Sequence, residues 1–128
     1  MFYRCPHCGN IVFFVNNSGA PITCCGEKMV ALAPNTSDGA GEKHVPMITM
    51  KEGDKESEWK VKVEVGEVEH PMTEEHYIQW IALETKSGVQ VKHLNPGDKP
   101  KAKFVAVKDE VIAAYEYCNL HGLWKRDM

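Results

Sequence analysis

The chain of 128 residues is 43% hydrophobic and carries a formal net charge of −3. A chain of this length can bury roughly two-thirds of its unfolded surface, enough for one core and a small satellite unit. The acidic balance argues against a nucleic-acid surface, which is normally basic, and against binding to an anionic membrane surface.

The start of the chain and the cysteine count bear on its cellular setting. The opening residues, MFYRCPHCGN, lack the basic segment and apolar run of a secretory signal. No stretch approaches the ~20 apolar residues of a membrane span. We therefore expect a cytoplasmic protein. Its five cysteines are an odd number in a reducing compartment, so metal ligation or catalysis is a better interpretation than a disulfide framework.

Four of the five cysteines fall within residues 1–33, around the apolar run at 11–15. This run predicts a short strand pair closed by a turn at 16–19, Asn-Asn-Ser-Gly. A segment below ~40 residues usually needs disulfides, metals or oligomerisation to fold, so a metal held by the cysteines would supply the missing stability. Residues 34–41, Pro-Asn-Thr-Ser-Asp-Gly-Ala-Gly, then predict a linker or mobile loop.

From Val45 onward the dominant pattern is alternation of apolar and polar residues. Residues 59–65 place Trp and three Val on one face and two Lys and a Glu on the other, which is the period of a half-buried strand. Residues 76–83 and 102–107 also predict strands. The segment 111–117 fits either a helix or a strand, and we expect a strand because the sheet needs partners.

Two turn signals separate these runs, Lys-Ser-Gly at 86–88 and Asn-Pro-Gly-Asp at 95–98. Their spacing is typical of a sandwich. The second segment is therefore expected to be a small antiparallel β-sandwich, which makes the whole chain all-β.

The first candidate site is a cysteine group in the N-terminal segment. Cys5 and Cys8 form a C-x2-C pair, and Cys24 and Cys25 are adjacent. Four thiolates can surround one tetrahedral metal, and both zinc and iron accept that set. A zinc ribbon generally carries two C-x2-C pairs, so the adjacent cysteines indicate a different architecture. His7, inside the first pair, is expected to be an exposed neighbour and not a ligand.

The second candidate site combines histidines with the remaining cysteine. A lone histidine is usually structural, but five histidines accompany a single thiol in the second segment. Imidazoles with one thiolate form a mixed nitrogen and sulfur set that suits iron, copper or zinc. The sequence therefore predicts a second metal site that includes Cys118, with candidate partners His44, His70, His76, His93 and His121.

These motifs resemble those of a known family. The N-terminal cysteine arrangement resembles desulforedoxin. Four further motifs resemble the iron-centre motifs of desulfoferrodoxin, the two-iron form of superoxide reductase. These motifs are Glu-Lys-His-Val-Pro at 42–46, His-Pro-Met at 70–72, His-Tyr-Ile-Gln-Trp at 76–80 and Cys-Asn-Leu-His-Gly at 118–122. The resemblance covers almost the whole chain and keeps the motifs in order.

The resemblance implies a domain organisation and two sets of iron ligands. Residues 1–36 would form a desulforedoxin-like domain, and residues 37–128 an immunoglobulin-like β-sandwich. The first iron would be held by Cys5, Cys8, Cys24 and Cys25, and the second, in a square pyramid, by His44, His70, His76 and His121 with Cys118 as the axial sulfur. His93 matches no family ligand and is expected to be structural or on the surface.

The resemblance also implies an activity. Ferrous iron in the second site would reduce superoxide to hydrogen peroxide without forming dioxygen. Lys43 would attract superoxide, and Glu42 would bind the ferric iron after turnover, with Gly39 and Gly41 allowing that segment to move. Backbone N–H groups near Leu120 and His121 would tune the Cys118 sulfur. A small electron carrier such as rubredoxin would re-reduce the iron, and the protein would be a homodimer.

Three other functions remain open from the residues alone. Both irons could only shuttle electrons, which would make the protein a non-catalytic electron-transfer module. Zinc in both sites would make it a structural binding adaptor without redox chemistry. A superoxide dismutase is the nearest enzymatic competitor.

Overall fold

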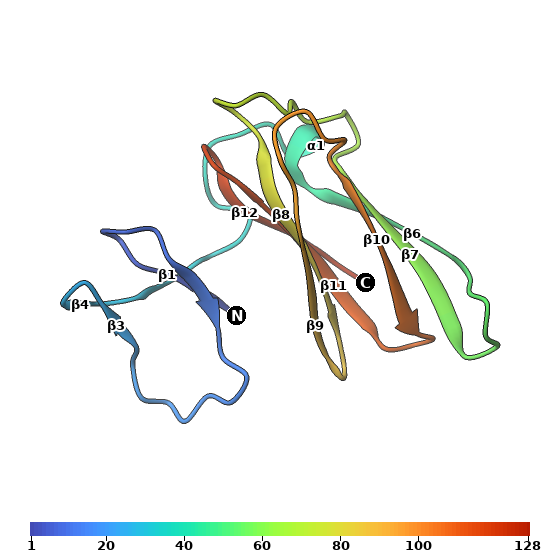
Figure 1. The fold of residues 1–128 in the computed structure, drawn as a ribbon, viewed down its shortest axis with the longest axis horizontal. Coiled ribbons are helices and arrows are strands. Elements are labelled where there is room, and N and C mark those ends of the chain that lie inside the picture. Colours follow the sequence, from blue (N-terminus) through green and yellow to red (C-terminus); the bar gives the residue numbers. More distant parts are fainter. The chain divides into compact units, whose positions relative to one another are not determined.

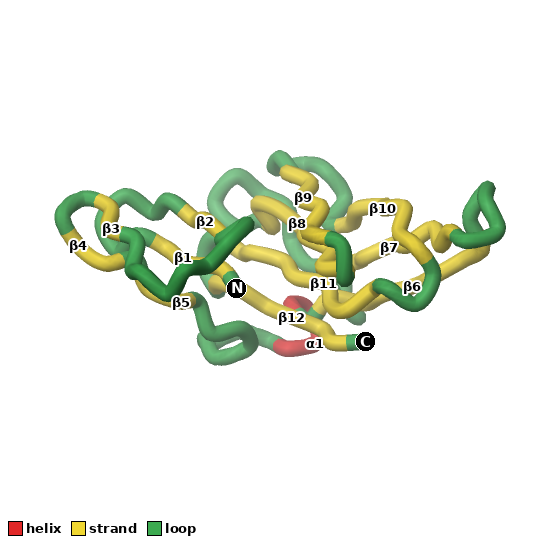
Figure 2. Tube along the Cα trace, turned by 90° about the horizontal axis from the view of Figure 1, so that it is seen from below, coloured by secondary structure: helices red, strands yellow, loops and turns green.

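Strands make up nearly all of the regular structure, with a single helical turn (Figure 2). The structure is a computed structural model that describes all of residues 1–128. It divides into two compact units, Met1–Ala33 and Pro34–Met128. The all-β class predicted from the sequence is therefore confirmed. The boundary between the units falls three residues before the one placed at 36/37 from the sequence.

The N-terminal unit contains two small antiparallel sheets. In the first, β1 (Phe2–Arg4) pairs with both β2 (Ile11–Phe13) and β5 (Val30–Ala31). In the second, β3 (Thr23–Cys24) pairs with β4 (Glu27–Lys28). Each strand has only two or three residues, so hydrogen bonding and packing within this unit are limited.

The strand pairing predicted for the apolar run at 11–15 was wrong. Strand β2 pairs backward with β1, in the register Phe2 with Phe13, and not forward across the segment 16–19. The reason is a tight loop between β1 and β2, in which the Cys5 N–H donates to the Asn10 carbonyl (2.9 Å) and the Gly9 N–H to the Cys5 carbonyl (3.1 Å). The C-x2-C segment thus forms the turn of the hairpin.

The second unit is an antiparallel sandwich of two sheets (Figure 1). One sheet has the order β10-β7-β6, formed by Lys101–Val107, Glu58–Val65 and Pro46–Glu52. The other has the order β12-β11-β8-β9, formed by Gly122–Asp127, Val111–Cys118, Ile78–Thr85 and Gly88–His93. The ambiguous segment at 111–117 is a strand, as predicted, and it lies inside its sheet.

Alternation along the strands creates the core between the two sheets. In β7 the residues Val61, Val63 and Val65 are buried while Lys60 is exposed, which is the predicted pattern. Strand β10 alternates in the same way, and burying such apolar side chains stabilises the unit by about 25 cal/mol per Å². The core cluster consists of Val61, Val63, Val65, Ile78, Ile81, Leu83, Ala102, Phe104, Ala106, Ala114 and Cys118.

One end of the sandwich collects the segments that carry the histidines. Pairing of Pro46 with Val65 brings the start of β6 to the end of β7. Pairing of Cys118 with both Ile78 and Gly122 brings the end of β11 to the starts of β8 and β12. The single helix α1 (Gly41–His44) directly precedes β6 and lies at this end (Figure 1). Antiparallel topology therefore gathers residues that are far apart in sequence.

The segment at 34–41, expected to be a linker or mobile loop, is instead bonded to β12. The Asn35 N–H donates to the Leu123 carbonyl (3.0 Å), and its side chain bonds both backbone groups of Lys125. The Ser37 hydroxyl donates to the His121 carbonyl. These bonds attach the segment to the sandwich before α1 begins.

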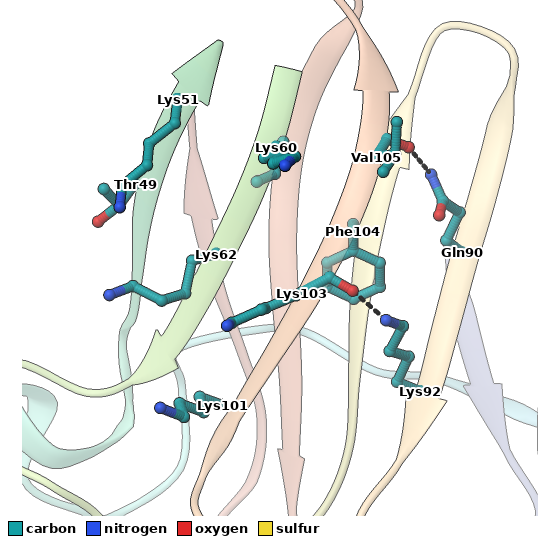
Figure 3. Close-up of a pocket in the computed structure, with 11 residues that line it drawn as sticks. Thr49, Lys51, Lys60, Lys62, Gln90, Lys92, Lys101, Lys103, Phe104 and Val105 are labelled. Atoms are coloured by element: carbon teal, nitrogen blue, oxygen red, sulfur yellow. Dashed lines mark hydrogen bonds between the residues drawn. The ribbon is translucent and has the colours of Figure 1, made fainter. Parts of the chain in front are cut away.

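The outer face of the three-stranded sheet is rich in lysine (Figure 3). An open hollow on this face takes residues from β6, β7 and β10 and from the adjacent β9. Its polar lining consists of Thr49, Lys51, Lys60, Lys62, Gln90, Lys92, Lys101 and Lys103. The one helix of the fold, with its four residues, is far too short to span a membrane.

Candidate metal centres

The four N-terminal cysteines converge on one point. Their sulfur atoms lie within 4.8 Å of one another, with Cys8 Sγ 3.6 Å from Cys24 Sγ and Cys24 Sγ 4.0 Å from Cys25 Sγ. Sulfurs bound at ~2.3 Å to one tetrahedral metal are roughly 3.8 Å apart. The four thiols therefore fit a single tetrahedral metal, as the sequence predicted.

A tight turn solves the problem posed by adjacent cysteines. Cys25 and Gly26 form the two-residue connection between β3 and β4, with φ of 54° and 76°. A two-residue hairpin turn with both central φ values positive is normally filled by Asn-Gly or Gly-Gly. Here a cysteine adopts the left-handed conformation, which turns its sulfur toward the same site as Cys24.

Backbone donors already favour a thiolate in this group. The Cys8 N–H contacts Cys5 Sγ at 3.4 Å. This contact is the main cause that lowers the pKa of the Cys5 thiol to about 6. The pKa values of Cys24 and Cys25 are raised, that of Cys25 to about 12, chiefly by hydrogen bonding with the Cys8 thiol. His7 is exposed and pairs with Glu27 at 3.3 Å, as expected for a neighbour that is not a ligand.

Five residues from separate segments meet at the end of the second unit. His44 ends α1, His70 and His76 lie in the connection between β7 and β8, Cys118 ends β11, and His121 lies in the turn before β12. One ring nitrogen or sulfur from each lies within 4.8 Å of the others. His93 does not join them and is exposed in β9, in agreement with the surface position expected from the sequence.

The four imidazoles are arranged as a square. Neighbouring ring centroids lie 4.7 Å apart for His44 and His70, 4.6 Å for His70 and His76, 5.0 Å for His76 and His121, and 4.8 Å for His121 and His44. The diagonal from His44 to His76 is 6.4 Å. Cys118 Sγ lies 3.6 Å from His70 Nε2 and 3.9 Å from His121 Nδ1.

The hydrogen bonds of two rings favour tautomers in which both Nε2 atoms carry a lone pair, as metal ligands do. Nδ1 of His44 lies 2.9 Å from the Ala40 carbonyl and Nδ1 of His70 2.6 Å from the Pro71 carbonyl, so both Nδ1 atoms carry hydrogen. The two Nε2 lone pairs then face each other at 3.2 Å. Two nitrogens bound at ~2.1 Å to one ion at a right angle are roughly 3.0 Å apart. A bound metal ion satisfies this arrangement.

Burial favours the neutral form of three of the imidazoles, His44, His70 and His76, and a neutral imidazole is the form that binds a metal. Burial is the main cause that lowers the pKa values of His44 and His76, and it lowers that of His70 to about 4. His76 Nε2 is buried without any hydrogen-bond partner. A buried polar atom normally has a partner, so this nitrogen is an open ligand position.

The Cys118 thiol experiences two opposing influences. Its burial in the core raises its pKa, and backbone N–H groups of His121 and Leu120 lower it. These are the donors that were expected beside this sulfur from the sequence. A metal ligand must be deprotonated, and N–H groups that point at the sulfur stabilise its thiolate form.

Glu42 and Lys43 lie on the exposed side of α1 and act on the histidines electrostatically. The charge of Lys43 lowers the pKa of His76, and that of Glu42 raises the pKa of His44. Their backbone is fixed, because the Glu42 carbonyl accepts the Val68 N–H (2.7 Å) and the Lys43 N–H donates to the Ala40 carbonyl (3.0 Å). Movement of these side chains is thus easier than movement of the helix.

One supporting residue, Trp124, was missed from the sequence, and another, Gly39, was expected in a different role. Trp124 stacks on His44, with centroids 4.8 Å apart, and its indole N–H donates to the His121 carbonyl at 3.1 Å. Gly39 lies so close to this pair that a Cβ there would meet His44 and Trp124 at 3.2 Å. Gly39 therefore permits close approach, whereas the sequence suggested a hinge. No local pattern could have identified either contact, because both depend on tertiary packing.

Comparisons with known proteins agree with this geometry. The family described as desulfoferrodoxin matches residues 36–127, and the desulfoferrodoxin N-terminal domain matches residues 1–32. A desulfoferrodoxin from Nitratidesulfovibrio vulgaris is 47% identical over 125 residues, which cover 98% of this chain and 94% of that protein. A superoxide reductase from Thermococcus kodakarensis is 38% identical, covering 78% of this chain and 97% of that protein.

A solved structure extends the similarity to three dimensions. The crystal structure of the superoxide reductase from Treponema pallidum aligns with a TM-score of 0.76 at 36% identity, covering 99% of both chains. The resemblance found in the sequence motifs is thus confirmed across both units. The chain belongs to the desulfoferrodoxin family.

Proposed function

We propose that this chain is a superoxide reductase that contains two irons. The observation that carries the proposal is the square of four imidazoles beside a buried thiol, found in a chain of the desulfoferrodoxin family. Relatives named superoxide reductase support it. The ligands we assign are Cys5, Cys8, Cys24 and Cys25 for the first iron, and His44, His70, His76, Cys118 and His121 for the second.

Iron held by the second set of ligands would supply one electron, which with two protons would convert superoxide into hydrogen peroxide. The residues around it prepare that step. Neutral imidazoles bind the metal because burial lowers the pKa values of His44, His70 and His76. Backbone N–H groups of Leu120 and His121 lower the pKa of Cys118 and so favour its thiolate form, against the burial that raises this pKa. The exposed Glu42 carboxylate, two residues before His44, would be available as a further ligand to an oxidised iron.

Lys43 is proposed to attract superoxide toward the site. It is exposed on α1, and its charge reaches His76. Lys43→Ala is expected to lower the second-order rate constant with superoxide by roughly 10-fold or more and to weaken its dependence on salt, since steering falls with ionic strength. Lys43→Arg should keep most of the rate. Pulse radiolysis measures both, with Lys86→Ala, an exposed lysine in the β8–β9 turn, as the control.

The reaction consumes electrons, so we propose an electron-donor protein of the rubredoxin type as the partner. We also propose a homodimer, because Phe13, Val15 and Val30 are exposed apolar residues of the N-terminal unit that pairing would bury. A cytoplasmic location agrees with four unpaired thiols reserved for a metal.

Product stoichiometry tests the function. The anaerobically reduced protein is mixed with a known amount of superoxide, and peroxide and dioxygen are counted while oxidation of the second iron is followed optically. We expect one peroxide per iron oxidised and no dioxygen. Dioxygen in a one-to-one ratio with peroxide would identify a dismutase, and iron that stays reduced would favour an electron-transfer role.

A further inference from the structure

The four histidines of the second site differ in how firmly the protein holds them. His44 is held by the Ala40 carbonyl and by stacking on Trp124. His70 is held by the Pro71 carbonyl, and the His121 backbone by the Trp124 indole. The His76 ring has no such hydrogen bond, and its buried Nε2 is the open ligand position. Its position therefore depends on the backbone of the loop that carries it.

That loop is a small turn closed on itself. Thr73 and His76 exchange both backbone hydrogen bonds, at 3.0 and 3.2 Å, and the Thr73 hydroxyl lies 3.1 Å from the His76 N–H. These bonds set the shape of the turn. They do not fix it relative to β11, which carries Cys118.

Asn119 makes that connection from the other side of the site. Its side-chain oxygen accepts the Tyr77 N–H (2.9 Å), and its side-chain nitrogen donates to the Glu75 carbonyl (2.9 Å). Its own N–H donates to the Tyr77 carbonyl (3.2 Å). One residue thus bonds both chain neighbours of His76 and is itself the chain neighbour of Cys118.

The local strand register makes this bridge necessary. The pairing of β11 with β8 shifts between Tyr117 and Cys118, so regular pairing is interrupted where the metal site begins. An amide side chain presents an acceptor oxygen and a donor nitrogen side by side, and this bridge uses both. Aspartate at 119 would keep the bond from Tyr77 and lose the bond to Glu75.

We propose that Asn119 is a positioning residue that holds His76 in register with Cys118 as ligands of one metal. It acts on His76 through the backbone of Glu75 and Tyr77. On the other side, its side-chain oxygen lies 4.0 Å from Cys118 Sγ. The proposal rests on the metal site assigned under the proposed function. It adds a residue whose effect is measured on metal binding and not only on turnover.

The test is ferrous iron affinity of the full chain, measured anaerobically by competition with a chromophoric chelator. Loss of an outer contact of a metal ligand typically costs 10–100-fold in affinity. We expect Asn119→Ala to weaken the second site by a factor in this range, with Asn119→Asp between it and the unchanged protein. The four-cysteine site should keep its affinity and serves as the internal reference.

A double-mutant cycle separates positioning from general loosening. If Asn119 acts through His76, Asn119→Ala should cause no further loss of affinity in a His76→Ala background. Gln90→Ala is the matched control, since its amide also donates to a backbone carbonyl, that of Val105 at 2.9 Å, and no ligand lies beside it (Figure 3). It should leave iron affinity unchanged.

Two results would overturn the proposal. One is unchanged iron affinity in Asn119→Ala, and the other is a full additional loss of affinity in the His76→Ala background. Failure of the proposed function is distinguishable, because it would appear as iron that binds normally to the unchanged protein but is not oxidised by superoxide.

Discussion

Glu116 is a carboxylate buried inside the core of the sandwich. It is 0% exposed, and neither side-chain oxygen has a hydrogen-bond partner. It lies in β11 between Ala114 and Cys118, which belong to the core cluster. Burial raises its pKa well above the usual value, which favours the protonated form in the folded protein. Its negative form also opposes ionisation of Cys118.

We expect Glu116→Gln to stabilise the protein at neutral pH. The pKa of Glu116 is higher in the folded than in the unfolded protein, so protonation of Glu116 favours folding. This contribution to stability is complete below the unfolded pKa of about 4.3 and is lost as pH rises through the folded pKa. A difference of one between the folded and unfolded pKa values changes the free energy of unfolding by about 1.4 kcal/mol. Urea unfolding of the metal-free proteins should show a higher free energy of unfolding for Glu116→Gln than for the unchanged protein at pH 8, and no difference near pH 4. An equal difference at both pH values would contradict this reasoning.

At the scale of elements, the lysine-rich face of β6, β7 and β10 places positive charges opposite one another on adjacent strands. Lys103 is the cross-strand partner of Lys62, and Lys51 that of Lys60 (Figure 3). Glu64 lies 3.1 Å from Lys62, and Asp54 lies 3.1 Å from Lys60. Like charges directly opposite on adjacent strands destabilise a sheet. Six lysines line this one surface on a chain with a negative net charge.

Lys103→Glu is therefore expected to raise the free energy of unfolding by about 0.5–1 kcal/mol. The gain should shrink at high salt, because the Debye length falls to about 3 Å at 1 M. Denaturant titrations at low and high salt measure it. Lys86→Glu makes the same change in net charge away from this face and should give no comparable gain. A gain of the same size in Lys86→Glu would show a net-charge effect instead.

The elements also show what sequence reasoning can and cannot reach. Strand β7 was predicted because one face is buried and the other exposed, which leaves a period of two. Helix α1 has four residues, begins at a glycine and shows no helical spacing of apolar residues, so the sequence did not predict it. The pairing of β2 was predicted wrongly because the turn of its hairpin is the C-x2-C segment, which was interpreted only as a metal-binding motif.

The candidate site divides along similar lines. Thiols and imidazoles are few in a chain and carry recognisable chemistry, so their types and the family motifs located all nine proposed ligands. The contacts that hold those ligands are backbone carbonyls, such as that of Ala40, and side chains such as Trp124. These act through tertiary placement, which single-sequence patterns do not contain.

At the scale of the whole molecule, the two units have different sources of stability. In the first 33 residues only Phe2 and Cys5 are buried apolar side chains, whereas the second unit has a core cluster drawn from four strands. A small unit without a core depends on its metal, since metal binding supplies its folding free energy. The second unit, with its own core, is expected to remain folded without metal.

Removal of both metals by a chelator at pH 7 should therefore unfold the N-terminal unit and leave the sandwich folded. Zinc fingers draw about 10 kcal/mol or more of folding free energy from their metal, which indicates the size of the loss. Amide hydrogen exchange measures the outcome. Protection should disappear in β1 and β2 and persist in β7 and β11. Simultaneous loss of protection in β7 would mean that the sandwich also depends on its metal.

The metal-free sandwich is in turn expected to lose stability in mild acid. The folded pKa values of His44, His70 and His76 are depressed, that of His70 to about 4. The unfolded chain, with a histidine pKa near 6.5, binds more protons between these values. The histidine contribution to stability is therefore complete above about pH 6.5 and is lost as pH falls toward 4.

His70→Gln tests the largest share of this effect, because glutamine cannot titrate and keeps a donor for the Pro71 carbonyl. Urea unfolding of the metal-free proteins between pH 4.5 and 7.5 should show a free energy of unfolding that changes less steeply with pH in the variant. The contribution of Glu116 is the same in both proteins and does not affect this comparison. Iron-loaded protein should show a steeper acid loss than either, since protons then displace a metal from the imidazoles. Equal slopes in the two metal-free chains would mean that His70 remains accessible to protons in the folded state.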